Sequence, residues 1–241
     1  MAAALLAGLI IFVAHAIAGA TGFGSAVLAL PLLALVVGLA PGKAALLILT
    51  TLLHLYIAAR WWRKASRREL LTILIIAGLG LPLGIVLFEV LPRQASLITL
   101  GIFVTLVGLQ GLIDRRVLLA LPRPIAKIML FLGGVVHGAF TTGGPLLVIY
   151  INQTVRDKSA FRSTLSVMWI ALNIAVMIGW TIAGTWPRET LQISLMGLPA
   201  LVAGIAVGEY VHHRLDSASF HVAVQIVLIA TGLVLVLTPL R

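Results

Sequence analysis

The sequence of 241 residues is 61% hydrophobic and only 10% charged, whereas a soluble domain carries about 25% charged residues because its surface faces water. This composition excludes a soluble globular domain and predicts a chain that lies mostly within a bilayer. The net charge of +10 sits in short loops between apolar runs, which is typical of topology signals and lipid contacts and not of nucleic-acid binding. The chain has no cysteine, so disulfides and thiolate chemistry are excluded.

The apolar runs predict an all-α fold, a polytopic transmembrane helix bundle. A helix of about 20 apolar residues crosses the roughly 30 Å of hydrocarbon in a bilayer. The first run has no basic segment before it and no convincing cleavage site, so it reads as a retained helix and not as a signal peptide. In chain order the runs lie near 3–20, 25–39, 43–62, 70–91, 95–113, 128–141, 144–153, 161–184, 190–211 and 219–239.

Two of the apolar stretches are interrupted by glycine-rich breaks, TGFGS at 21–25 and TTGGP at 141–145. Glycine and proline destabilise helix interiors, and irregular backbone at membrane depth is tolerated only where it faces protein or a watery cavity. Residues 128–153 are too few for two crossings of about 20 residues each. We therefore expect a glycine-broken or re-entrant helix pair in each half of the chain.

The breaks belong to an internal repeat, which predicts a first transmembrane repeat at 1–114, a basic cytoplasmic linker at 115–127 and a second transmembrane repeat at 128–241. Repeats of this kind are typical of secondary transporters, whose binding site lies where the repeats meet. The landmarks occur in the same order in both halves: His15 with His137, Lys43 with Lys158, GLP 80–82 with GLP 197–199, and Glu89 with Glu209.

The distribution of positive charge favours inverted repeats over parallel ones. If each broken segment enters and leaves on one side, the cytoplasmic loops are 60–68, 114–127, 154–162 and 212–216, and they hold 13 of the 17 Lys and Arg residues. If each broken segment crosses once, the cytoplasmic loops hold 11. Cytoplasmic loops carry an excess of Lys and Arg, so we predict inversion.

The two breaks together predict an anion-binding cradle. A helix that restarts within the membrane presents unpaired N–H groups and a positive dipole end, glycines let a ligand approach the backbone, and hydroxyls add donors. The alternative is that these small residues only permit close helix packing. The residues of the cradle are Gly22, Gly24 and Ser25 from one half and Thr141, Thr142, Gly143 and Gly144 from the other.

His15 and His137 lie one to two turns before each break. Histidine is costly inside a membrane and titrates near neutrality, so both are candidates for donating to an anion or carrying a proton. Alternatively each is a neutral side chain bonded to a neighbouring helix. No third metal ligand lies near them in sequence, so we expect neither a metal nor another cofactor.

Four further polar residues are candidates. Arg162 is either a ligand that holds the anion through bidentate hydrogen bonds or a cytoplasmic anchor that reaches the interface. Asn173 is either an interhelical hydrogen bonder or a cavity liner. Glu89 and Glu209 are either proton-coupling carboxylates or interfacial partners of Arg93 and Arg214.

The segments around both breaks resemble the sulfite exporter TauE/SafE family of membrane permeases. AGATGFGSAVLALPLLALVVG (18–38) is similar to the glycine-rich signature of that family, and GGVVHGAFTTGGPLLVIYINQ (133–153) with FRSTLSVMWIALNI (161–174) is similar to its second copy. The chain departs from the pattern at Gly22-Phe23-Gly24-Ser25 and at Thr141-Thr142, which precede only two glycines. The resemblance implies a multi-pass permease of the cytoplasmic or inner membrane that moves small sulfur-containing anions such as sulfite or a short sulfonate.

Three other function classes compete with a carrier that works by alternating access, with or without proton coupling. An anion channel shares re-entrant segments. An intramembrane enzyme needs a catalytic constellation. Neither Ser25 near His15 nor Glu209 near His212 and His213 has a convincing third member, so we predict no enzyme. An assembly factor would not need two glycine breaks with adjacent histidines. The expected partners are a small anion, anionic lipid headgroups at 60–68 and 115–127, and no nucleic acid. The sequence is compatible with a homodimer.

Overall fold

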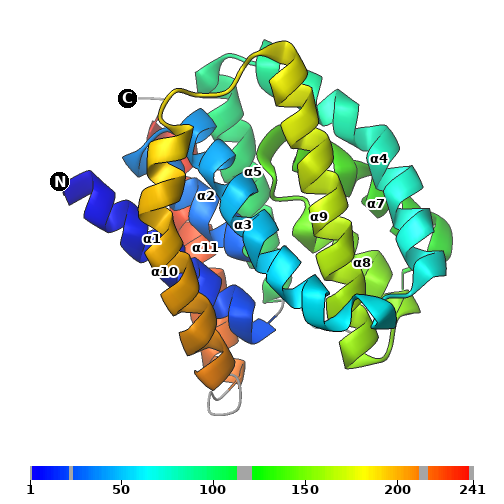
Figure 1. Cartoon of the computed structure of the whole chain (residues 1–241). Helices are drawn as coiled ribbons and strands as arrows, with labels where there is room; N and C mark the ends of the chain where they lie inside the picture. The colour runs from blue at the N-terminus through cyan, green and yellow to red at the C-terminus, as the bar shows by residue number, and fades with distance from the viewer. Residues whose placement is uncertain (1, 22–23, 113–120, 212–216, 239–241) are drawn as a thin grey trace.

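The apolar runs form helices in the order that the sequence predicts. The computed structural model describes residues 2–21, 24–112, 121–211 and 217–238, and this part of the chain contains helices and short connections but no strand. All ten predicted segments are confirmed as helices, and the all-α fold with them. The helices are α1 (Ala2–Thr21), α2 (Ser25–Val36), α3 (Leu39–Trp61), η1 (Trp62–Lys64), α4 (Arg67–Val90), α5 (Arg93–Gly111), α7 (Arg123–Phe140), α8 (Gly144–Thr154), α9 (Lys158–Ala183), α10 (Thr190–Val211) and α11 (Ser217–Leu237) (Figure 1).

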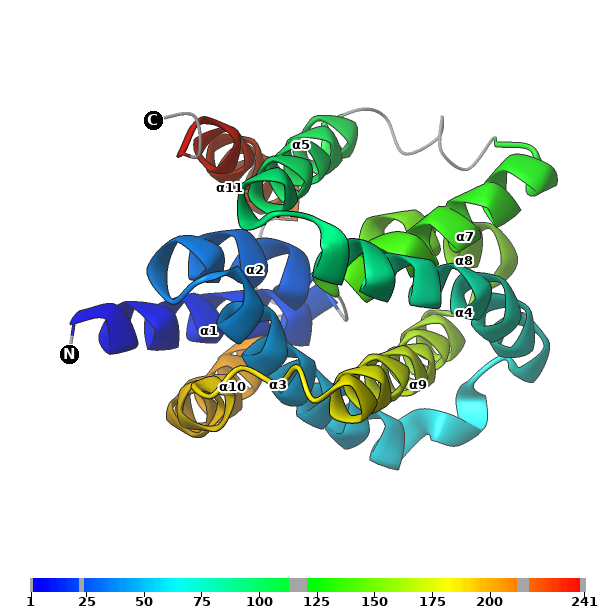
Figure 2. The same ribbon diagram turned by 90° about the horizontal axis from the view of Figure 1, so that it is seen from above.

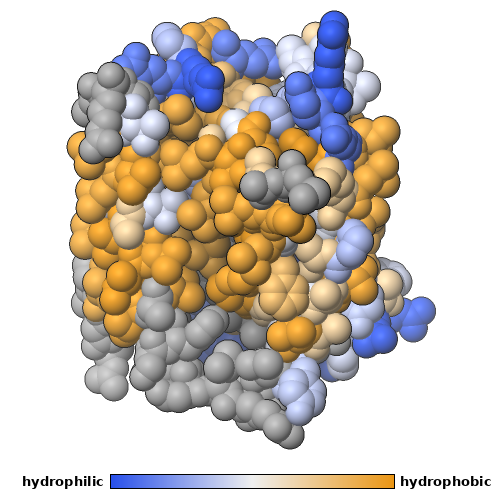
Figure 3. Space-filling model, turned by 90° about the vertical axis from the view of Figure 1, so that its left-hand side faces the viewer, coloured by the Kyte–Doolittle hydropathy of each residue, from blue (hydrophilic) through white to orange (hydrophobic). Residues whose placement is uncertain are grey.

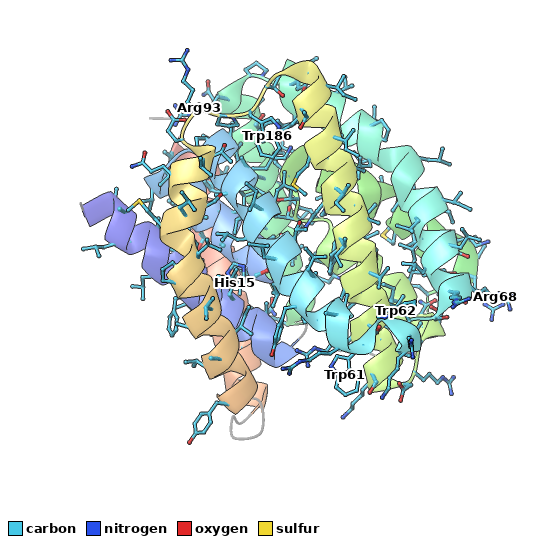
Figure 4. The ribbon with its side chains drawn as sticks, in the orientation of Figure 1. His15, Trp61, Trp62, Arg68, Arg93 and Trp186 are labelled. Carbon is cyan, nitrogen blue, oxygen red and sulfur yellow. The ribbon has the colours of Figure 1, made fainter. Side chains whose placement is uncertain are left out.

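The bundle has the dimensions and surface of a membrane protein. Within the described residues, six helices are long and apolar enough to cross a bilayer: α3 with η1, α4, α5, α7, α9 and α10. Apolar side chains cover much of the face drawn in Figure 3, and hydrophilic ones gather at its ends. Trp61, Trp62 and Arg68 lie at one end of the molecule, and Arg93 and Trp186 at the other (Figure 4). Tryptophan and basic residues favour the two interfaces of a bilayer, which confirms a multi-pass membrane protein.

Both glycine-rich breaks interrupt helices as predicted. The first lies between α1 and α2, where Gly24 has a φ of 98°, and the second lies between α7 and α8, where Thr141 has a φ of 57°. These left-handed conformations end the regular helical path. The helices that follow, α2 and α8, have 12 and 11 residues and are too short to cross the hydrocarbon alone, since a crossing needs about 20.

Several helix boundaries differ from the sequence expectation by a few residues, most of all the start of α7. Helix α7 begins at Arg123 and not at the apolar run from 128, with proline in its first turn, a position where the missing N–H of Pro124 leaves no helical hydrogen bond unmade. Residues 123–127, which the sequence placed in the basic linker, are therefore the start of α7. Residues 113–120 of that linker lie outside the described part of the chain.

Helices of one half pack mainly on helices of the other. Helix α4 lies along α7, α1 along α10, α5 along α11, and α3 against α9 (Figure 2). Glycines bring the α4 and α7 backbones together: a Cβ atom at Gly84 would collide with the Val135 carbonyl oxygen, and one at Gly138 with the Leu81 carbonyl oxygen. Close approach through small residues is the usual way to pack helices in lipid. The two halves are interleaved as a result.

Two pairs of helices, one helix of each pair from either half of the chain, run in opposite directions. The α3 and α9 helices are antiparallel, as are α4 and α10 (Figure 1). The end of α3 lies beside the start of α9, because the Ser163 hydroxyl donates to the Trp61 carbonyl (2.6 Å) and the Ser66 N–H donates to the Thr164 hydroxyl (2.9 Å). Residues 61–66 and 163–164 are thus at the same end of the molecule.

Candidate functional site

The second break is a buried turn with polar atoms. The Thr141 hydroxyl donates to the Phe140 carbonyl (2.6 Å), while the buried Thr142 hydroxyl has no hydrogen-bond partner among the described residues. A Cβ atom at Gly143 would collide with the Gly133 carbonyl. The close approach of this turn to α7 therefore requires glycine at 143. A Cβ atom at Gly144 would lie 3.5 Å from the Trp169 ring, which is ordinary contact. The start of α8 is therefore covered by an indole.

The first break is only partly described, since Gly22 lies outside the described residues. Gly24 precedes α2 in a left-handed conformation (φ 98°), and a Cβ atom there would meet nothing within 4 Å. Its requirement for glycine is therefore conformational and not steric. Ser25, the first residue of α2, is buried. This end of α2 thus starts inside the protein.

His137 belongs to a buried hydrogen-bond network that joins α7, α9 and α3. Its Nε2 atom lies 3.0 Å from Oδ1 of Asn173, and Nδ2 of Asn173 donates to the hydroxyls of Thr50 (3.2 Å) and Thr51 (3.0 Å). Asn173 thus forms interhelical hydrogen bonds to α7 and α3. The other ring nitrogen of His137, Nδ1, is buried and without a partner in the described structure.

His15 is also buried, and its ring is bonded to its own helix. Nδ1 donates to the Ile11 carbonyl (2.7 Å), and Nε2 has no partner among the described atoms. His54 on α3 lies within electrostatic reach of both His15 and His137. The Trp169 ring packs between the α3 and α7 histidines, with centroids 6.2 Å from His54 and 5.2 Å from His137. His54 therefore links the two predicted histidines, and the sequence analysis missed it.

Lys43 is a second buried residue near His137 that the sequence patterns did not single out as a site candidate. Its side chain is 0% exposed, its Nζ donates to the Gly138 carbonyl (2.8 Å), and it lies 3.8 Å from the Phe88 ring centroid and 4.6 Å from that of Trp180. Aromatic faces attract cations, and the carbonyl adds a hydrogen bond. Its charge also reaches His137. The amino group of Lys43 is therefore held in the interior, bonded to the residue that follows His137.

Arg162 and the two glutamates lie further out. Arg162 is half-buried, its Nε has no partner in the described part of the chain, and its charge reaches His54. Glu89 is exposed and within electrostatic reach of Lys43. The side chain of Glu209 lies outside the described residues. The roles predicted for these three residues stay predictions.

The helix starts reveal equivalences that the sequence landmarks missed. Lys43 and Arg162 each lie four residues after the first residue of α3 and α9. In the same way, His54 lies 15 residues after the first residue of α3, and Asn173 lies 15 residues after the first residue of α9. Lys43 and Arg162 thus occupy the same helix position, whereas Lys158 is the first residue of α9 and is exposed. Counting from the helix starts, and not matching short strings, is the signal that would have found Lys43 and His54.

A cavity of about 280 Å³ lies between α1 and α10, lined by Ala7, Gly8 and Gln192 among others. It also touches Ile11, whose carbonyl accepts from His15. Ile11 therefore contacts both the cavity and the buried His15. Among the described residues, no group of three His, Asp or Glu side chains is placed to hold a metal ion.

Comparison with known proteins agrees with the membrane architecture. The chain is 27% identical over 177 residues to a Comamonas testosteroni protein named "Probable inner membrane transporter protein TsaS", an alignment covering 71% of this chain and 73% of the relative. No solved structure matches it. The family model described as "Sulfite exporter TauE/SafE" matches residues 7–235, nearly the whole chain. The resemblance seen in the sequence is confirmed: this chain belongs to the sulfite exporter TauE/SafE family of membrane transporters.

Proposed function

We propose that the chain is a secondary transporter of the cytoplasmic or inner membrane that moves a small sulfur-containing anion, such as sulfite or a short sulfonate, by alternating access. The relative named as an inner membrane transporter supports the location. Anionic lipid headgroups contact 60–68, where Arg60, Arg63 and Lys64 flank exposed tryptophans.

The observation that carries the proposal is the fully buried side chain of Lys43, which we infer to be an ammonium when the anion is bound. An isolated buried charge is costly, and the hydrogen-bond acceptor of Lys43 is a neutral carbonyl and not a carboxylate. Its positive charge lies within reach of His137, just before the break that contains Thr142. An anion bound beside this break would neutralise part of that charge and so gain binding energy.

The chemistry of the break residues suits an oxyanion. The Thr142 hydroxyl is a donor without a partner among the described residues, and α8 starts at Gly144 with unpaired N–H groups. Arg162, at the equivalent helix position to Lys43, supplies a second cation near His54. A sulfite or sulfonate group presents three oxygens, which such converging donors can share.

Alternating access follows from the interleaved halves. A carrier with inverted repeats exchanges the conformations of its two halves when it turns from one side to the other. The contact between the end of α3 and the start of α9 supports inversion. The first break then opens toward one side and the second toward the other.

The test is uptake into proteoliposomes of sulfite, sulfate, sulfoacetate, taurine and lactate, each with and without an imposed pH gradient. We expect saturable flux of at least one sulfur-containing anion. Flux that does not saturate and follows voltage alone would indicate an anion channel. Absence of flux for every anion would contradict the proposal.

The variants Lys43→Met and Lys43→Arg test the site itself. Methionine keeps much of the volume between Phe88 and Trp180 but removes the charge, so we expect at least about a tenfold loss of anion affinity, the equivalent of one lost charged hydrogen bond. Arginine keeps the charge and should retain more affinity than methionine. The matched control is Lys158→Met, which removes an exposed lysine and should leave affinity unchanged. Equal affinities for Lys43→Met and the native protein would remove Lys43 from the site.

A further inference from the structure

The two threonines next to Asn173 determine which way its amide points. The hydroxyls of Thr50 and Thr51 donate to the carbonyls of Leu46 and Leu47, each at 2.6 Å. A hydroxyl has one hydrogen to donate, so toward Asn173 both oxygens can only accept. The Asn173 group that faces them must therefore be its NH₂.

The amide orientation in turn determines the tautomer of His137. With the NH₂ of Asn173 facing the threonines, its carbonyl oxygen Oδ1 faces Nε2 of His137 at 3.0 Å. A carbonyl oxygen only accepts hydrogen bonds, so Nε2 carries the hydrogen. In the neutral ring the other nitrogen, Nδ1, then bears a lone pair. This is the nitrogen that is buried without a partner in the described structure.

His15 shows the same arrangement with the nitrogens exchanged. Its Nδ1 faces the Ile11 carbonyl at 2.7 Å and must donate to it, so Nε2, the unpartnered nitrogen, bears the lone pair in the neutral ring. A lone pair repels an anion. Either histidine can therefore contact an anion through its unpartnered nitrogen only when that nitrogen has taken up a proton.

The groups around His137 couple this proton to the anion. A second positive charge near a buried ammonium is unfavourable, and a bound anion offsets it. Proton and anion binding therefore favour each other, and the coupling is reciprocal. The charged and titratable groups concerned are Lys43 and His54 on α3, Arg162 on α9 and His15 on α1, both within reach of His54, and Glu89 on α4, within reach of Lys43.

We propose that the site takes up its anion together with one proton, which binds Nδ1 of His137, and that Asn173 is the positioning residue that makes this proton necessary. The inference rests on the proposed anion-binding function of the same site. The proton comes from the aqueous side to which the site is open, and it leaves with the anion on the other side. On binding, the N–H bond at Nδ1 forms as an O–H bond of a hydronium ion breaks, and on release the proton returns to water.

The experiment counts protons when methanesulfonate binds to the purified protein. Methanesulfonate stays ionised throughout the range in which histidine titrates, so any proton taken up is bound by the protein. Isothermal titration calorimetry in two buffers of different ionisation enthalpy gives the number. Between about pH 6 and pH 8, where histidine titrates, we expect uptake of about one proton per anion. Over the pH range in which His137 is neutral before binding, we expect affinity to fall about tenfold per pH unit, the dependence for one coupled proton.

Two variants separate the proton acceptor from its positioning residue. In His137→Gln the proton uptake should vanish. In the double variant Thr50→Val with Thr51→Val, Asn173 is free to turn and donate to Nε2, so Nδ1 can carry the ring hydrogen without added charge. The pH dependence should then flatten although His137 is present. The conservative pair Thr50→Ser with Thr51→Ser should restore it. Thr231→Val, which removes the same type of hydroxyl-to-carbonyl bond in α11, should behave as the native protein.

The outcomes distinguish the two proposals. No binding of methanesulfonate at any pH would count against the sulfonate site itself. Binding without proton uptake, or proton uptake that persists in His137→Gln, would overturn the inference and leave the transporter proposal standing. If His137→Gln does not fold, the proton count of the native protein and the threonine variants still decide.

Discussion

Gly24 and Gly144 lie at the two helix breaks but differ in what they require. Gly24 has a φ of 98°, and Gly144 is helical with room for a Cβ atom 3.5 Å from the Trp169 ring. An L-residue in the left-handed region costs about 1–2 kcal/mol, whereas alanine in a helix is favoured over glycine by up to about 1 kcal/mol. Gly24→Ala should therefore lower the thermal unfolding temperature in detergent, and Gly144→Ala should leave it equal or higher. The reverse order would contradict the assigned conformations.

Asn173 satisfies three buried groups at once, so its removal should be costly. Asn173→Leu leaves the two threonine oxygens and the Nε2–H of His137 without partners, and each unsatisfied buried polar group costs about 1–3 kcal/mol. We expect a clear fall in the free energy of unfolding, measured by denaturant titration in detergent. Asn152→Leu, at an exposed asparagine, is the control and should change it little. Similar values for the two variants would exclude the network as a stabilising element.

Residues beside a sequence break were predictable, and residues whose role depends on distant partners were not. His15 and His137 stood out because each precedes a glycine break. Lys43 looked like a helix-start cation, since its acceptor, the Gly138 carbonyl, is 95 residues away. The burial of Lys43 arises only when α7 and the aromatic residues of α4 and α9 close around it. Asn173 was left with two interpretations for the same reason, because its partners are on α3 and α7.

At the scale of the helices, the α4–α7 contact depends on the absence of side chains at glycine. A Cβ atom at Gly84 would collide with the Val135 carbonyl oxygen, whereas one at Gly78, on the same helix, would meet nothing within 4 Å. Gly84→Ala should force the helices apart and lower the thermal unfolding temperature. The free energy of unfolding should fall by at least about 1–3 kcal/mol, the range typical of overpacked cores. Gly78→Ala should be neutral or slightly stabilising. Circular dichroism melts of both variants test this, and equal melts would mean that α4 and α7 are not in close contact.

The positions of the helices could be predicted from the apolar runs, but which helices pack against each other could not. Length, glycine breaks and polar loops were enough to place all ten helices, because in a bilayer every backbone group must be satisfied within its own segment. The start of α7 was missed because Arg123 and Pro124 are not apolar, although they are suited to a first turn. Which helices pair depends on glycine contacts between segments far apart in sequence, such as Gly84 with Val135. No pattern within one helix reveals such a partner.

At the scale of the whole molecule, the halves are equivalent in helix order but differ in chemistry. The α3 helix places Lys43 in full burial and His54 deeper in the bundle, whereas α9 places a half-buried Arg162 and Asn173 at the same positions. Helix α3 therefore carries a lysine and a histidine where α9 carries an arginine and an asparagine. If the proton binds to one half only, as we infer for His137, the other half does not need a proton-binding residue at the equivalent position.

The orientation of the halves in the membrane can be tested because the native chain has no cysteine. Single cysteines at exposed positions can then be labelled with a maleimide that does not cross membranes. The end of α3 is hydrogen-bonded to the start of α9, so Lys64→Cys and Lys158→Cys must lie on one side. The excess of Lys and Arg at that end predicts that it faces the cytoplasm.

We therefore expect Lys64→Cys and Lys158→Cys to react only in inside-out vesicles. Thr185→Cys, which follows α9 at the opposite end of the helix, should react in intact cells. Parallel repeats would put positions 64 and 158 on opposite sides of the membrane, because the second broken pair would then cross it once. Labelling of those two cysteines from different sides would exclude the inverted arrangement, and with it the alternating exchange of the two halves.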